Sequence, residues 1–195
     1  QLIHGLGDSI KVNAQMLKVH AYEYSAWASA FSISTSLDFY QLTQGVPELV
    51  SAMQSGLYGQ GDVAQMLENE IVNIYGAALV DLASLENNAL FSVACLMVLM
   101  GEGNISELEA CGVRLSAIDQ SYFVRDYPIF GVDPADRSFT CLGTEDNARL
   151  RLRKLVAEIR PELVVRAARI LIKAGRCDIA MDLADAFLDR SAVLE

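Results

Sequence analysis

The chain has 195 residues, of which 52% are hydrophobic, and its formal net charge at pH 7 is −10. This length fits one domain whose core needs no metal or disulfide to hold it, and the hydrophobic share predicts a thick helical core or a subunit that buries further surface against a partner. The longest apolar run, residues 89–100, is too short for a membrane span, because such a helix covers about 18 Å of a ~30 Å hydrocarbon core.

Helical patterns begin near the start of the chain. Ser9 can cap a helix over residues 10–31, which has a broad apolar and aromatic face. Two shorter helices are predicted in STSLDFYQL and VPELVSAMQ. A long helix then follows from a cap at Asp62 to about residue 85, with apolar residues at helical spacing.

The middle of the chain combines helical segments with one irregular stretch. The run from Asn88 to Met100 is apolar on every side, which predicts a helix at the centre of the core. The segment NISELEACGVRLSAI predicts another helix, in which Ser106 and Glu109 have the spacing of a capping box. Residues 119–147 show no clear period and contain two prolines, so we expect an irregular aromatic loop there.

The C-terminal part returns to a helical pattern. Thr144 is a candidate cap for one helix, Arg160-Pro161 begins the next, and the last helix is expected over residues 178–188. Strand signals are nearly absent, apart from a brief SFTCL. The predicted fold class is all-α, with about eight helices in an irregular bundle or in stacked α-hairpins.

We expect three regions within one domain. Residues 1–118 form an acidic and apolar helical bundle, residues 119–147 the irregular aromatic loop, and residues 148–195 a basic-then-acidic helical hairpin. This division follows from the charge distribution, because acidic residues dominate the N-terminal region and basic residues are concentrated in the C-terminal region.

Glycine residues recur at predicted helix corners. Gly61, Gly103, Gly143 and Gly175 are 42, 40 and 32 residues apart, which is the size of a helix pair. A glycine can adopt the left-handed conformation that closes one helix, while the polar residue after it caps the next. With thirteen glycines in the chain, a chance match is the alternative.

The segment over residues 161–188 resembles a single tetratricopeptide hairpin, with Gly175 followed five residues later by Ala180. The aromatic positions of that family and its period of roughly 34 residues are absent. The resemblance implies a helical hairpin at this position and covers nothing else in the chain.

Charge is distributed unevenly along the chain. No lysine or arginine occurs from Val19 through Val113, whereas nine of the fifteen basic residues lie between Arg149 and Arg176. This polarity favours head-to-tail self-association or a charged partner. The alternative is that the acidic and basic regions fold against each other.

Seven basic residues form the candidate surface for a protein or nucleic-acid partner: Arg149, Arg153, Arg160, Arg166, Arg169, Lys173 and Arg176. The last four share one helical face and are suited to phosphate contacts. An acidic stripe on the next helix offers an alternative that we favour over nucleic-acid binding. Folding at Gly175 would pair Lys173 with Asp182, Arg169 with Asp185 and Arg166 with Asp189, with Asp178 completing the stripe.

The irregular loop supplies a second candidate surface: Tyr122, Phe123, Tyr127, Ile129 and Phe130. Such residues suit a contact with a partner protein. Packing against the core of the same domain explains them equally well.

No catalytic, metal or cofactor site is predicted. The chain has only two histidines, no CxxC spacing among its four cysteines and no nucleophile motif. The dispersed cysteines favour free thiols in a reducing, cytoplasmic compartment, although a chain that begins at Gln1 would not show a removed leader.

We therefore predict a non-enzymatic helical protein-interaction module, an adaptor, chaperone or assembly subunit that binds a protein partner or copies of itself. The alternative is a nucleic-acid-binding, nucleoprotein-like helical protein that uses the Arg149–Arg176 surface. An enzyme without a recognisable motif is the third hypothesis.

Overall fold

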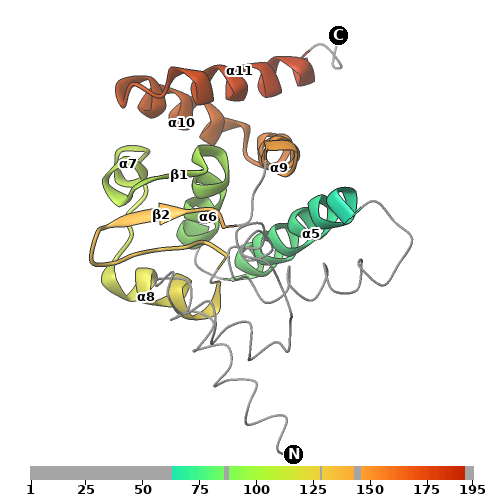
Figure 1. Ribbon diagram of the computed structural model, residues 1–195. Helices are drawn as coiled ribbons and strands as arrows, with labels where there is room; N and C mark the ends of the chain where they lie inside the picture. Colours follow the sequence, from blue (N-terminus) through green and yellow to red (C-terminus); the bar gives the residue numbers. More distant parts are fainter. Residues whose placement is uncertain (1–62, 86–87, 128, 143–145, 192–195) are drawn as a thin grey trace, which may run out of the picture. The chain divides into compact units, whose positions relative to one another are not determined.

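The computed structural model describes residues 63–85, 88–127, 129–142 and 146–191 (Figure 1). The helices predicted before residue 63 and the proposed caps and corners at Gly61, Asp62, Gly143 and Thr144 lie outside these residues. The chain divides into two compact units, residues 1–70 and 71–195. Apart from residues 63–70, which begin helix α5, the fold and the surface described below belong to the second unit.

The described residues are mostly helical, in agreement with the predicted all-α class. The elements in chain order are α5 (Val63–Ser84), α6 (Asn88–Met100), β1 (Glu102–Asn104), α7 (Ile105–Ala110), α8 (Ala117–Asp126), β2 (Ser138–Thr140), α9 (Asp146–Ile159), α10 (Pro161–Lys173) and α11 (Cys177–Ser191). The weak strand signal in SFTCL corresponds to β2, which pairs antiparallel with β1 and places Phe139 opposite Gly103.

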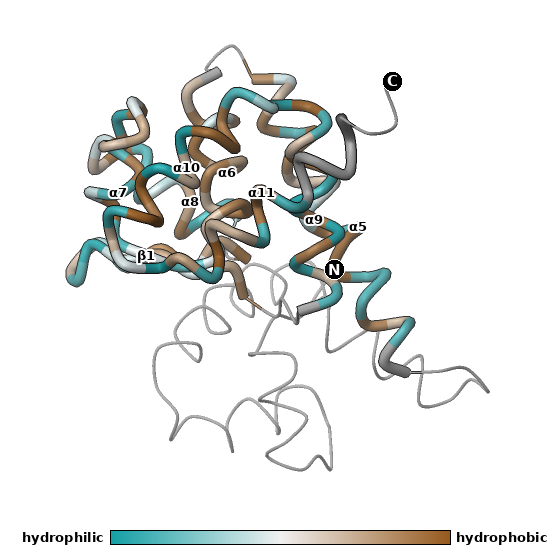
Figure 2. The backbone as a smooth tube through the Cα atoms, turned by 90° about the horizontal axis from the view of Figure 1, so that it is seen from above, coloured by the Kyte–Doolittle hydropathy of each residue, from teal (hydrophilic) through white to brown (hydrophobic). Residues whose placement is uncertain are grey.

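The central helix of the second unit is α6, and it has the predicted bounds. Every residue from Val93 to Met100 is at most 2% exposed, because α6 is apolar on all sides and α7, α9 and α10 pack around it. In Figure 2 its tube is mostly brown, whereas α5 alternates between teal and brown. None of the described helices is both long and apolar enough to cross a membrane.

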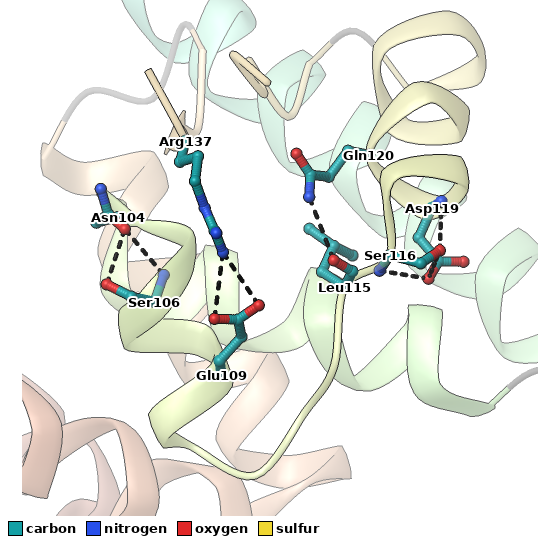
Figure 3. A network of polar contacts seen from close by, with 8 residues as sticks. All are labelled: Asn104, Ser106, Glu109, Leu115, Ser116, Asp119, Gln120 and Arg137. Atoms are coloured by element: carbon teal, nitrogen blue, oxygen red, sulfur yellow. Dashed lines mark hydrogen bonds and ion pairs between the residues drawn. The ribbon is translucent and has the colours of Figure 1, made fainter. Parts of the chain in front are cut away.

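The cap of α7 differs from the predicted one. Asn104 accepts a hydrogen bond from the backbone N–H of Ser106 at 2.9 Å, and Glu107 accepts one from the backbone N–H of Asn104 at 3.0 Å. The capping box is therefore Asn104–Glu107 rather than Ser106–Glu109, because the helix starts directly where β1 ends. The predicted Glu109 instead pairs with Arg137 at 3.1 Å (Figure 3).

The stretch over residues 119–147, for which the sequence predicted an irregular loop, includes most of α8 and all of β2. Helix α8 starts with a capping box between Ser116 and Asp119 (Figure 3). One turn further on, the amide of Gln120 is buried and donates to the carbonyl of Leu115 at 3.2 Å. A glutamine on the buried face removes the apolar period, which is why the sequence pattern did not reveal this helix.

The α10–α11 hairpin turns at Gly175, as predicted. Helix α10 begins with Pro161 at its first position, and α11 lies along it in Figure 1. Gly175 has φ of 78°, and the N–H groups of Gly175 and Arg176 donate to the carbonyls of Ile172 and Leu171. This pair of hydrogen bonds is a Schellman motif, in which glycine occupies the left-handed position.

The predicted recurrence of such corners fails at Gly103. This glycine lies within β1 and pairs with Phe139 across the sheet, so it closes no helix.

Candidate interaction surface

The seven predicted basic residues divide into two groups. Three are exposed, namely Arg166, Arg169 and Lys173. Arg153 is buried, and Arg149, Arg160 and Arg176 are half-buried. The predicted continuous basic surface is therefore split, and each group has its own neighbours.

Two of the covered arginines donate to the C-terminal end of α6. The Nε of Arg153 donates to the carbonyl oxygen of Leu99 at 3.1 Å, and Nη2 of Arg176 donates to that of Met100 at 2.7 Å. The last carbonyls of a helix have no partner within the helix and carry partial negative charge. Since α6 ends inside the core, guanidinium groups replace the water that would otherwise bind these carbonyls.

A third arginine lies beside the same helix end. A Cβ atom placed on Gly101, the residue after α6, would lie 3.7 Å from Nε of Arg149. The part of the sequence that is rich in arginine thus supplies the positive charge that the central helix requires at its C-terminus.

Carboxylates balance two of these buried charges. Arg153 pairs with Asp182 of α11 at 3.3 Å, and Arg176 pairs with Glu107 of α7 at 3.4 Å. Burial, together with the nearby charge of Arg149, lowers the pKa of Arg153, and Asp182 acts in the opposite direction. A buried guanidinium is tolerated only with such partners.

Of the three ion pairs predicted across the hairpin, the described residues contradict two, and they leave the pair of Arg166 with Asp189 untested. Asp182 binds Arg153 rather than Lys173, and no ion pair between described residues joins Arg169 to Asp185. Arg166 donates instead to the carbonyl of Cys111 at 3.5 Å, and the side chain of Asp189 lies outside the described ones.

The reason lies in the rotation of the two helices. Helix α10 buries Leu163, Val164, Ala167 and Leu171, and α11 buries Ala180 and Leu183. The charged residues of the two helices therefore lie on their exposed sides, away from the helix contact.

Arg160 has a local role at the start of α10. It pairs with Glu162, and its guanidinium lies over the ring of Phe91 at 5.5 Å from the centroid. The hydrogen bond from Arg160 lowers the pKa of Glu162. These contacts engage Arg160 within its own unit.

The aromatic residues predicted for partner contact are mainly part of the core. Phe123, Ile129 and Phe130 are buried, whereas Tyr122 and Tyr127 are half-buried. The rings of Phe123 and Phe130 meet edge to face at 5.6 Å, and Phe130 meets Tyr75 of α5 at 5.3 Å. The segment therefore packs against its own unit, which is the alternative that the sequence left open.

The exposed side of the hairpin carries apolar residues that sequence reasoning missed. Val165 and Ile172 of α10 are 44% and 58% exposed, and Met181 of α11 is 67% exposed. Ile172 lies next to Arg169 on the helix surface, on the side away from Lys173, so its signal was hidden at the margin of the basic stripe. We call the exposed side of α10 and α11 the hairpin face.

Contacts at the edges fix the order of residues across the hairpin face. Arg166 reaches the end of α7, which places the basic edge of α10 away from α11. Asp182 reaches α9, which places the acidic edge of α11 away from α10. Because successive residues turn by about 100°, Ile172 and Met181 face the seam between the two helices.

The hairpin face consequently has three parallel bands. The acidic band comprises Asp178 and Asp185, the apolar band comprises Val165, Ile172 and Met181, and the basic band comprises Arg169 and Lys173. All seven residues are exposed. Among the described residues, no ion pair engages the charged members of these bands.

The three buried thiols of the second unit are not activated as nucleophiles. Burial raises the pKa of Cys95 and Cys141 to about 12 and that of Cys111 to about 11, so these thiols stay protonated at neutral pH. Within the described ranges, no three histidine, cysteine or carboxylate side chains are grouped so as to hold a metal ion.

Comparison with protein-family models, with curated proteins and with solved structures gives no significant match.

Proposed function

We propose that the chain is a helical protein-interaction module, an adaptor, chaperone or assembly subunit that docks a protein on its hairpin face. The observation that carries this proposal is the apolar band, in which Ile172 and Met181 are more than half exposed between two bands of opposite charge. Exposed apolar area bordered by charged residues is typical of protein–protein contacts.

The second candidate function is nucleic-acid binding, favoured by the exposure of Arg166, Arg169 and Lys173. Two observations weigh against it. Arg153 and Arg176 are engaged at the end of α6, and the acidic band lies on the same face as the remaining basic residues. Phosphate backbones would be repelled by Asp178 and Asp185.

Site-specific cross-linking tests the proposed function. A photoreactive amino acid at position 172 of the full chain should yield a discrete protein adduct in the native extract, and Met181→Glu should abolish that adduct. A photoreactive group at Ile118 of α8 is the matched control, because Ile118 is also apolar and is 82% exposed but lies off the hairpin face.

A discrete adduct at position 172 that Met181→Glu abolishes, together with the absence of that adduct at position 118, supports the proposal. The proposal is wrong if position 172 yields no protein adduct, or if it yields only adducts that Met181→Glu leaves unchanged. A mobility shift with random RNA that Arg169→Glu abolishes would favour the second candidate instead.

A further inference from the structure

We infer that the hairpin face docks a second copy of this chain, with a twofold axis that runs along the seam between α10 and α11. This inference rests on the proposed function and names its partner. It follows from the order of the three bands, because that order makes the face complementary to itself.

A twofold axis along the seam turns one hairpin over onto the other. The two apolar bands then meet, and the acidic band of each copy lies over the basic band of the other copy. A twofold axis across the seam would instead place acid over acid and base over base. Closed dimers use one surface on both subunits, and like-charge contact is costly, so the bands select the first orientation.

The positions of the charged residues along the seam agree with this orientation. A twofold axis along the seam leaves each residue at the same height along the seam, so charges that pair must lie at similar heights. Lys173 is the last residue of α10 and Asp178 the second residue of α11, so their heights along the seam differ by about 2 Å at most. Arg169 and Asp185 lie about 6 Å and 12 Å from the corner. The long side chain of Arg169 spans that difference.

The size of the face predicts a weak dimer. Helix α10 has 13 residues and is therefore about 20 Å long, and two helices of about 10 Å diameter present roughly 400 Å². A standard stable interface buries about 800 Å² on each partner. We therefore expect a dissociation constant on the order of 10–100 µM that weakens as salt screens the charged bands.

Complementary charge reversal tests the inference by sedimentation equilibrium of the full chain at low salt. The first variant combines Arg169→Glu with Lys173→Glu, and the second combines Asp178→Lys with Asp185→Lys. In a dimer of either variant, like charges face each other at both edges, so each variant alone should associate at least tenfold more weakly than the wild type. In an equimolar mixture both edges become attractive, so the mixture should form dimers with nearly wild-type affinity.

The mixture distinguishes charge pairing from damage to the fold, because two misfolded variants cannot restore each other. If mixing restores no association, or if the wild type stays monomeric at low salt up to a tenfold excess over the expected dissociation constant, the inference is wrong. In that case the cross-link from position 172 decides the proposed function independently. A discrete adduct to another protein then shows that the face docks a different partner, and absence of any adduct contradicts both claims.

Discussion

The division of the basic residues into two groups predicts that neighbouring charges in one hairpin differ strongly in their effect on stability. Arg176→Met removes the guanidinium that donates to Met100 and pairs with Glu107, while the apolar stem is retained. Lys173→Met is the matched control, because Lys173 is exposed at the end of α10 and no described ion pair engages it.

The magnitude follows from the lost contacts of Arg176. A hydrogen bond from a charged donor contributes about 1.5–3 kcal/mol, a cation at a helix C-terminus adds about 0.3–1 kcal/mol, and the half-buried pair with Glu107 adds about 1 kcal/mol at most. We expect Arg176→Met to lower the free energy of unfolding by about 2–5 kcal/mol. Lys173→Met loses only the dipole contribution of α10, so its cost should stay below about 1 kcal/mol.

Urea unfolding of the full chain, followed by circular dichroism at low protein concentration, measures both values. Low concentration keeps the chain monomeric, so loss of dimer contacts at Lys173 does not enter the comparison. Equal effects of the two substitutions, or a cost below about 1 kcal/mol for Arg176→Met, would refute the role assigned to the arginines at the end of α6.

Three further substitutions or conditions test the described unit. Gly103→Ala should cost about 1–3 kcal/mol of unfolding free energy, because its Cβ would collide with the capping carboxylate of Glu107; an unchanged urea midpoint would contradict this. Tyr75→Phe should cost about 1–2 kcal/mol, because the single phenol O–H lies 2.9 Å from two backbone carbonyl oxygens and is shared between them, whereas Tyr75→Ala should cost about 3–5 kcal/mol; an unchanged urea midpoint for Tyr75→Phe would argue against the hydrogen bonds. Burial raises the pKa of Cys95 from its ordinary 9.0 to about 12, so above pH 9 the unfolded chain loses this proton while the folded chain keeps it. Stability should therefore fall as pH rises from 9 to 12, by about 1.4 kcal/mol per pH unit for this thiol, and Cys95→Ala should flatten the slope by that amount in urea titrations.

The elements that the sequence predicted well are those with a local cause. Helix α6 was predictable because apolar residues surround it completely, and the corner at Gly175 because a glycine follows an amphipathic helix. Pro161 marked the start of α10 for the same kind of reason, since proline fits the first helical turn.

The elements that the sequence missed depend on distant contacts. The side chain of Arg153 points to the carbonyl oxygen of Leu99, 54 residues earlier in the chain. No local sequence pattern indicates that contact. The buried amide of Gln120 likewise hid α8. Charge spacing showed which charged residues recur along α10 and α11 but not their partners, because the partners depend on how α9, α10 and α11 are rotated.

The division of the basic residues into a covered and an exposed group changes how the charge polarity along the sequence is interpreted. Part of the positive charge between residues 149 and 176 stabilises the buried end of α6 and is not available to other molecules. The remainder lies next to an apolar band, and we propose that it orients a protein partner rather than attracts phosphate.

Hydrogen exchange of the full chain tests docking on the hairpin face most directly. It is measured at two concentrations, one well below and one well above the dissociation constant of the dimer. The account predicts that amides of α10 and α11 exchange more slowly at the higher concentration, while those of α8 are unchanged, and that high salt removes the difference. Protection confined to other elements, with α10 and α11 unaffected, would contradict it.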